Sequence, residues 1–377
     1  MIRIPFNRPF AVGTEIDQLR LAIATPKFSG DGSYTARCHR LLEQSLGIPQ
    51  ALLTTSCTHA LEMAALLLDI GPGDEVILPA FTFVSTANAF VLRGARPVFV
   101  DIRADTLNID ETKIEAQITS RTRAIFLLHY AGVGCAMDKI LGLAQAHRIA
   151  IVEDNAHGLY GKYEGRYLGT FGALAALSFH ETKNFTCGEG GALLINDARF
   201  GPRSEIIREK GTDRSRFFRG EIDKYNWVDV GSSYLPSDLL AAFLQVQLEH
   251  REFIQSARRY LWETYARELA DWARQNEVRL PIIPHGCEQT YHMFYLIMPS
   301  AESRQSFISH LAGHGILAVF HYLPLHLSPM GRQFGGREGQ CPVTEDLSER
   351  LVRLPFFTGM TSAEQTEVVG RVRAFRA

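Results

Sequence analysis

Short apolar runs alternate with helical segments through the middle of the chain, and this alternation restricts the fold more than any other feature. The runs lie at residues 76–79, 97–102, 124–129, 149–152 and 173–177. Because they are apolar on both faces, we expect them to form buried strands of a mostly parallel sheet that helices cover. The predicted fold class is therefore α/β, with a site at the carboxyl ends of the strands.

A nearly unbroken helical pattern over residues 238–274 follows this part of the chain. With 377 residues, the chain is too long for one simple core and suits a large domain joined to a smaller one. Beyond the helical pattern, expected strands and helices are typical of a small α+β domain. We predict a large domain of residues 1–247 and a small C-terminal domain of residues 248–377.

Composition argues against several classes of function. The 39 Lys and Arg residues balance 41 Asp and Glu residues, which argues against nucleic-acid binding through broad attraction to phosphate. No apolar run is long enough to span a bilayer, and the first residues lack the apolar core of a signal peptide, so we expect no membrane partner and a cytoplasmic location. The six cysteines lack metal-binding spacing, and we predict no metal site.

Lys183 stands shortly after the end of a predicted strand and before a glycine-rich turn at residues 188–191. We therefore expect its amine on a short loop at a strand end. Partial burial there would lower its pKa and leave a neutral, nucleophilic fraction, as a Schiff-base lysine requires. The alternative for these residues is a surface lysine in a turn.

The pattern Ser-Phe-x-x-x-Lys-x-x-x-x-Gly-Glu-Gly-Gly at residues 178–191 resembles the lysine motif of the DegT/DnrJ/EryC1/StrS sugar aminotransferases. This resemblance extends over essentially the whole chain. It implies a large domain of pyridoxal phosphate (PLP) fold type I with a smaller C-terminal α+β domain. It also implies PLP as the cofactor, with pyridoxamine phosphate as an intermediate.

The resemblance assigns the chemistry to three residues. Lys183 would hold PLP as an internal aldimine and move protons, and Asp154 would bond the ring nitrogen. His157 stands where the family has Gln or His and would face the phenolic oxygen of the cofactor. Without the resemblance, Asp154 could be a carboxylate that caps a helix, and His157 a histidine without a functional role.

Further residues would bind the cofactor. The element at residues 56–61 would hold the phosphate at a helix N-terminus, with Thr58 and His59 contributing beside Ser178. Phe83 would stack on the pyridine ring. Ser233 replaces an Asn that in many relatives reaches the phosphate across the dimer, so the resemblance implies a homodimer with shared active sites.

Candidate contacts to the substrate come from three elements: a Gly-x-Tyr-Thr element, a basic loop and a Tyr-x-Pro-Leu-His element. For the basic loop, a solvated loop is the alternative that the residues leave open. The candidate residues are Tyr34, Lys210, Arg214, Arg219, His321 and His326.

Within the family, the resemblance is closest to members that aminate dTDP-4-dehydro-6-deoxy-D-glucose. It implies that L-glutamate and this nucleotide sugar give dTDP-4-amino-4,6-dideoxy-D-galactose and 2-oxoglutarate. Amination to the D-glucose epimer, or at carbon three, stays open.

Three other classes also stay open. A PLP-dependent 3-dehydratase of the same fold carries His in place of the lysine, and Lys183 argues against it. A regulator that only binds PLP would carry a DNA-binding module, which no segment or basic face supplies. The third class is a sugar-nucleotide binding protein without cofactor.

Overall fold

A seven-stranded sheet forms the centre of the computed structural model, which describes residues 2–376. Its strand order is β1-β9-β8-β5-β4-β2-β3. Strand β9 is antiparallel to both of its neighbours, whereas the pairs from β8 to β3 are all parallel. The strands are β1 (Gln50–Thr54), β2 (Glu75–Pro79), β3 (Arg96–Val100), β4 (Thr122–Leu128), β5 (Ala150–Asp154), β8 (Leu174–Ser178) and β9 (Gly191–Ile195). The prediction of a mostly parallel sheet is confirmed.

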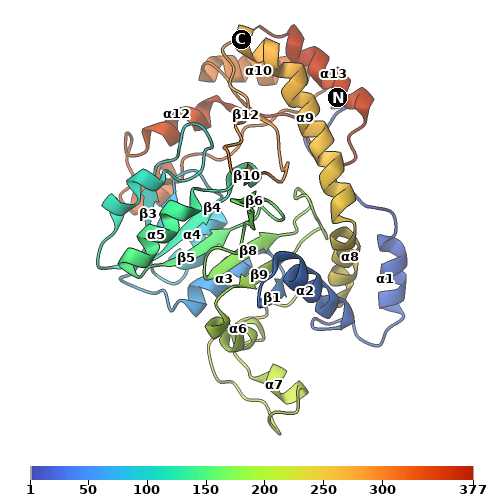
Figure 1. Ribbon diagram of the computed structural model, residues 1–377, viewed down its shortest axis with the longest axis vertical. Coiled ribbons are helices and arrows are strands. Elements are labelled where there is room, and N and C mark those ends of the chain that lie inside the picture. Colours follow the sequence, from blue (N-terminus) through green and yellow to red (C-terminus); the bar gives the residue numbers. More distant parts are fainter. Residues whose placement is uncertain (1, 377) are drawn as a thin grey trace.

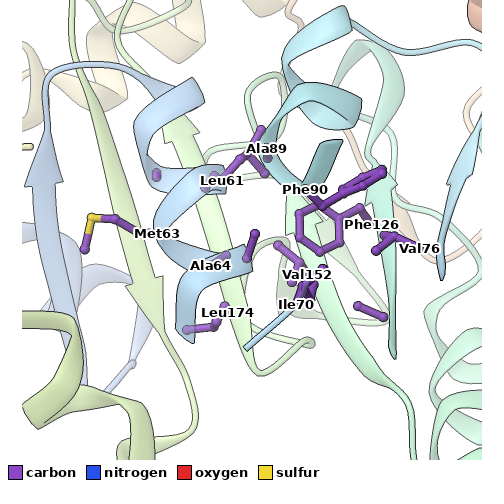
Figure 2. Close-up of a cluster of buried hydrophobic side chains, with 14 of the residues drawn as sticks. Leu61, Met63, Ala64, Ile70, Val76, Ala89, Phe90, Phe126, Val152 and Leu174 are labelled. Carbon is purple, nitrogen blue, oxygen red and sulfur yellow. The ribbon is translucent and has the colours of Figure 1, made fainter. Parts of the chain in front are cut away.

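Helices α3 (Cys57–Leu67) and α4 (Val84–Val91) cover one face of this sheet. Successive side chains of a strand point to opposite faces, so every second residue of each strand meets these helices. Phe126 and Val152, for example, lie in one cluster with Phe90 of α4 and Leu61 of α3 (Figure 2). Apolar burial on this face fixes α3, whose N-terminus faces the site described below.

Other helices cover the opposite face. Helices α2 (Ser33–Leu46) and α8 (Asp238–Glu249) pack on one half of it, where Leu53 and Leu177 are buried. Helix α5 (Met137–His147) packs on the other half, against Ile125 and Ile151. Both faces are therefore covered, which explains why the strands read as continuous apolar runs.

The helical pattern predicted over residues 238–274 forms two helices rather than one. Helix α8 ends at Glu249, and α9 (Arg251–Gln275) begins two residues later. His250 between them has φ −98° and ψ 22°, outside the helical range. Helix α9 runs from the sheet to the C-terminal part of the chain (Figure 1).

The C-terminal part forms a second, smaller unit. Strand β11 (Tyr295–Ile297) pairs with β12 (Leu351–Arg353) in an antiparallel ladder. Helices α10 (Ala301–Gly313) and α13 (Ser362–Ala374) pack with α9 around a separate apolar core that contains Phe294, Phe307 and Val368. The predicted small α+β unit is present.

The beginning of the chain packs with this smaller unit. Ile4 is 2% exposed and lies in its core. Its backbone forms a parallel bridge with Ile316, and the Phe6 carbonyl accepts a hydrogen bond from the Phe356 N–H at 3.1 Å. The predicted division at residue 247 stays a prediction, but the first residues pack with the small unit and not with the sheet.

The remaining elements lie at the edges of these two cores. Helix α7 stands away from the sheet at the end of an extended loop (Figure 1). None of the helices within residues 2–376 is long and apolar enough to cross a membrane. The elements are α1 (Glu15–Ile23), α6 (Gly201–Arg208), α7 (Arg214–Phe218), α11 (Pro329–Gln333), α12 (Pro342–Arg350), β6 (Lys162–Tyr163), β7 (Arg166–Tyr167), β10 (Cys287–Glu288) and the 3-10 turns η1 (Glu111–Lys113), η2 (Glu115–Gln117), η3 (Tyr130–Gly132), η4 (Ala198–Phe200) and η5 (Leu325–Leu327).

Candidate active site

A cavity of about 610 Å³ lies at the carboxyl ends of the parallel strands. Strands β5 and β8 contribute Asp154 and Ser178, their last residues, and Lys183 follows on the loop after β8. The smaller unit contributes side chains such as Tyr322 and Arg353. The cavity therefore lies where the two units meet, at the edge of the sheet where a site is predicted.

Lys183 lines the cavity from a loop held by backbone bonds. Its N–H donates to the carbonyl of His180 at 2.9 Å. Burial lowers the pKa of the Lys183 ammonium, and nearby Arg353 acts in the same direction, while Asp154 opposes the change. No carboxylate within residues 2–376 forms an ion pair with Lys183. The amine is thus placed to be neutral and nucleophilic.

Asp154 faces the same cavity and is 3% exposed. Its Oδ2 accepts a hydrogen bond from the Thr86 hydroxyl at 2.7 Å, and its Oδ1 accepts one from the Ala156 N–H at 3.2 Å. Burial raises the pKa of this carboxyl, whereas both hydrogen bonds lower it and so favour the ionised form. The carboxyl is therefore fixed in position and suited to pair with a cationic ring nitrogen.

The N-terminus of α3 forms another wall. The Ser56 hydroxyl caps the helix by accepting from the His59 N–H at 3.1 Å, so the N–H groups of Cys57 and Thr58 have no partner within the helix. The Thr58 hydroxyl donates to Ser85 at 2.8 Å. These N–H groups, the helix dipole and the nearby Ser178 hydroxyl suit an anion such as a phosphate.

A glycine allows this wall to form. A Cβ on Gly191, the first residue of β9, would lie 2.4 Å from the Cys57 nitrogen. Only glycine lets the backbone of β9 approach the start of α3 so closely. The Gly-Gly pair that ends the lysine motif therefore has a packing role next to the site.

His157 is buried in a group of stacked rings. Its ring centroid lies 4.3 Å from that of His292, with the planes at 21°, and its plane is within 7° of the Tyr322 ring. Its Nδ1 accepts from the Ala131 N–H at 3.3 Å. Burial lowers the pKa of His157 well below its usual range. The neutral ring thus carries its proton on Nε2, which lies 3.3 Å from the Tyr322 hydroxyl oxygen.

Phe83 lines the cavity at the start of α4 and is 54% exposed. An aromatic ring that is half exposed inside a cavity, and not buried in the core, has a face available to a flat ligand. Its centroid is 6.2 Å from that of Tyr322. His321, from the smaller unit, also lines the cavity.

Four predicted residues do not line this cavity. For Tyr34, His59 and His326, the structure contradicts a side-chain contact there. Tyr34 is 5% exposed in the core beside α8, because the start of α2 is tied to Asp238. The His59 ring bonds the Thr55 hydroxyl and packs on Tyr234, so only its backbone faces the helix end. His326 is fully buried, and its Nε2 bonds Glu345 at 2.9 Å. Arg219 pairs with Glu205 and Glu221 and does not line the cavity. It belongs to the basic loop, which as a whole lies outside this cavity.

Three other predicted residues line a second cavity, of about 1000 Å³. These residues are Lys210, Arg214 and Ser233. Lys27 adds a further cation, and Glu209 bonds Lys210 at 2.8 Å and Arg214 at 3.3 Å. Within one chain, these residues do not contribute to the cavity that contains Lys183.

Several residues of the site were not predicted. Thr86 carries no local signal, because it follows β2 whereas Asp154 ends β5, and β4 lies between these two strands in the sheet. Cys57, whose Sγ lies 3.9 Å from Asp154 Oδ1, also lines the cavity. No local pattern marks His292 or Arg353, because both come from the small unit.

The chemistry of this donor set fits PLP, the cofactor implied by the resemblance. Lys183 can hold an aldehyde, Asp154 a ring nitrogen, and Phe83 a ring face. The N-terminus of α3 and the hydroxyls of Thr58 and Ser178 can hold a phosphate. No group of three or more potential metal ligands occurs within residues 2–376.

Comparison with known proteins points to the same cofactor. Residues 11–373 match the model of the DegT/DnrJ/EryC1/StrS aminotransferase family. An uncharacterized protein of Methanocaldococcus jannaschii, MJ1066, is 32% identical over 99% of this chain and 98% of its own. Spore coat polysaccharide biosynthesis protein SpsC of Bacillus subtilis is 30% identical over 98% of this chain and 96% of its own.

A solved structure shares both the fold and the cofactor. Spr1654 of Streptococcus pneumoniae in its PLP-form superposes with a TM-score of 0.91 at 26% identity, over 98% of each chain. The match covers both the sheet and the smaller unit.

Proposed function

Because the chain belongs to the DegT/DnrJ/EryC1/StrS aminotransferase family and is a PLP-dependent sugar aminotransferase, we propose that it aminates dTDP-4-dehydro-6-deoxy-D-glucose. L-glutamate is the amino donor, and dTDP-4-amino-4,6-dideoxy-D-galactose and 2-oxoglutarate are the products. The placement of Lys183 and Asp154 in one cavity carries the aminotransferase part of this proposal. Its choice of sugar is supported by the resemblance of residues 179–184, 210–215, 231–235 and 319–326 to family members that act on this ketone.

PLP, when bound, supplies an aldehyde that accepts an amino group and a ring that withdraws electrons from the neighbouring carbon. Asp154 would hold the proton of the ring nitrogen, since its carboxylate is fixed by Thr86 and Ala156. Phe83 would orient the ring, and the Nε2–H of His157 faces the cavity beside Tyr322.

Lys183 is the base and acid of the reaction. Its Nζ takes the proton from the α-carbon of the donor in the first half of the cycle. In the second half, Nζ delivers a proton to carbon four of the sugar. The lowered pKa of Lys183 keeps a neutral amine available, as general base catalysis near neutral pH requires. Because Lys183 reaches the sugar from one side only, that side sets the configuration of the new amine.

We also propose a homodimer with two shared active sites. The basic residues Lys210 and Arg214 lie outside the Lys183 cavity in their own chain, so a role in substrate binding requires them to serve a second chain. The loop around them is rich in exposed apolar side chains: Phe218 and Trp227 are 69% and 78% exposed. Such a surface is typical of a subunit interface. Arginine would then bind the diphosphate of the nucleotide sugar.

The alternatives differ in the product. Amination that gives the D-glucose epimer, or at carbon three, would use the same residues with the sugar turned in the cavity. A role in the synthesis of cell-surface polysaccharide is supported by the name of the related SpsC protein. The cytoplasmic location stays a prediction.

One incubation tests the proposal. The cofactor-loaded enzyme is mixed with L-glutamate and dTDP-4-dehydro-6-deoxy-D-glucose, and the configuration at carbon four of the product is read by NMR. The D-galactose configuration is expected. The D-glucose epimer would replace the product assignment, and the absence of any amino sugar would reject the acceptor while leaving the family membership untouched.

A further inference from the structure

The cavity contains the side chain of Arg353, a cation to which the mechanism above gives no role. Arg353 ends strand β12 and is the only guanidinium among the described residues that line the cavity. It comes from the smaller unit, whereas Asp154 and Ser178 come from the sheet.

The backbone of Arg353 is fixed in the structure. It pairs with Tyr295 in the β11–β12 ladder and exchanges two hydrogen bonds with Val319, at 2.7 and 3.1 Å. Its side chain is also held in place. The Nε and Nη2 atoms donate to the carbonyl of Phe320 at 3.2 and 2.9 Å, and the guanidinium lies 4.5 Å from the centre of the Phe6 ring.

The charge of Arg353 has no counter-ion within residues 2–376. None of the ion pairs in this part of the chain includes Arg353. Among the described residues, the backbone carbonyl of Phe320 is the only group that accepts a hydrogen bond from the Arg353 side chain. The Nη1 atom and the second hydrogen of Nη2 remain able to donate. Together they form one edge of a planar fork, which matches the two oxygens of a carboxylate.

We infer that Arg353 binds a carboxylate group of the amino donor. The inference rests on the proposed function, in which glutamate supplies the amine. The donor must bring its amino group to the cavity that contains Lys183, and its carboxylates are the anionic groups of that half of the cycle. The sugar ring of the acceptor carries no charge, and its diphosphate is assigned to the basic loop of the second chain.

Electrostatics in the cavity agree with this role. Arg353 contributes to lowering the pKa values of Lys183, His157 and His321, so its charge acts on the reacting side of the cavity. Burial also lowers the pKa of Arg353 itself. A bound carboxylate supplies the missing partner of this partly buried charge.

The test compares three variants of the cofactor-loaded enzyme. Arg353→Gln removes the charge, Arg353→Lys keeps it without the planar fork, and Arg332→Gln is the matched control. Like Arg353, Arg332 donates from Nε to a backbone carbonyl, that of Leu327 at 3.1 Å, but it does not line the cavity. The probe is maleate, a dicarboxylate without an amino group, titrated by calorimetry. KM is measured separately for glutamate and for the nucleotide sugar.

For Arg353→Gln, we expect the Kd of maleate and the KM of glutamate to rise about 10- to 100-fold, as for a lost hydrogen bond to a charged group. The KM of the sugar should stay within about twofold of the wild-type value. A role limited to folding would instead change the KM values of both substrates alike. Arg353→Lys should fall between, and Arg332→Gln should match the wild type.

The inference is overturned if maleate does not bind the wild type, if it binds Arg353→Gln equally well, or if the sugar KM rises as much as the glutamate KM. If Arg353→Gln does not fold, the same comparison is made with Arg353→Lys, and an unchanged Kd for maleate in that variant overturns the inference. If the wild type fails to aminate the proposed ketone, the acceptor is wrong. The maleate titration and the release of 2-oxoglutarate from glutamate alone still report on Arg353.

Discussion

The Thr86 hydroxyl donates a hydrogen bond of 2.7 Å to Oδ2 of Asp154 and so links the first turn of α4 to the end of β5. Thr86 is fully buried, and its own oxygen lies 2.9 Å from that of Thr82. The carboxylate that we propose to face the ring nitrogen is thus positioned by a residue of a helix that covers the sheet.

Replacing Thr86 by Val should weaken this arrangement. The hydrogen bond lowers the pKa of Asp154, so its loss raises that pKa further and disfavours the ionised carboxylate. We expect kcat/KM to fall about 10- to 100-fold and PLP to dissociate more readily. Thr82→Val is the control, because its hydroxyl touches Thr86 but not Asp154. Equal losses in both variants would show that the hydroxyl pair acts through packing.

Replacing Lys183 by Ala should remove catalysis, because no other amine lines the cavity within the described chain. We expect kcat to fall about 100- to 10,000-fold, the range for loss of a general acid and base. Reduction of the cofactor-loaded wild type with borohydride, followed by peptide mapping, should place the label on Lys183. A label on another residue, or turnover by the Ala variant, would contradict the assignment.

The burial of Lys183 should appear in the stability of the cofactor-free protein. Because folding lowers the pKa of this base, the folded chain binds fewer protons than the unfolded chain between the two pKa values, and stability rises with pH there. The cost of the buried ammonium is largest below the folded pKa and disappears above the unfolded pKa of about 10.4.

Lys183→Met should therefore have a higher Tm than the wild type near pH 7, and the two melting curves should converge as pH rises toward 10. Lys224→Met is the control, since Lys224 is exposed, and its Tm should follow that of the wild type at each pH. A constant difference between Lys183→Met and the wild type across this pH range would contradict the burial effect.

Gly191→Ala should disturb the start of α3. The new Cβ would lie 2.4 Å from a backbone nitrogen, which cannot move aside as a flexible side chain does. We expect a loss of about 1–3 kcal/mol of stability and weaker PLP binding. Gly142→Ala in α5 has no heavy atom within 4 Å of its new Cβ and should gain up to about 1 kcal/mol from helix propensity. Equal Tm values for the two variants would refute the close approach.

Mixing two inactive variants tests the shared active sites. Lys183→Ala lacks the amine, and Arg214→Glu lacks a cation of the basic loop. A mixed dimer holds one complete site if Arg214 serves the other chain, so refolding the two together should restore about a quarter of the wild-type activity. No recovery, although mixed dimers form, would place Arg214 outside the partner's site.

The sequence predicts the sheet and the residues at its edge because both depend on local order. Each of the five strands predicted for the sheet is present within two residues of its expected bounds, since a strand buried on both faces must be apolar throughout. Asp154 ends β5 and Lys183 follows the end of β8, and the adjacency of these parallel strands brings both residues to one cavity.

Contacts between the two units could not be predicted in the same way. His326 belongs to an element that resembles a substrate-binding motif, yet the turn that carries it directs its ring to Glu345. Tyr34 follows a loop rich in glycine, but the side chain of Asp238, more than 200 residues later, pulls the start of α2 into the core. Arg353 was missed because only the β11–β12 ladder brings it to the cavity.

The bridge between Ile4 and Ile316 and the bond between Phe6 and Phe356 have a consequence for synthesis on the ribosome. Because this core combines Ile4 with residues near the carboxyl end, such as Val368 and Val372, it closes only after nearly the whole polypeptide has emerged, while the sheet has all seven strands by residue 195. Nascent chains should thus acquire protease-resistant sheet structure first. Occupation of the crevice between the units by cofactor must then await the end of translation.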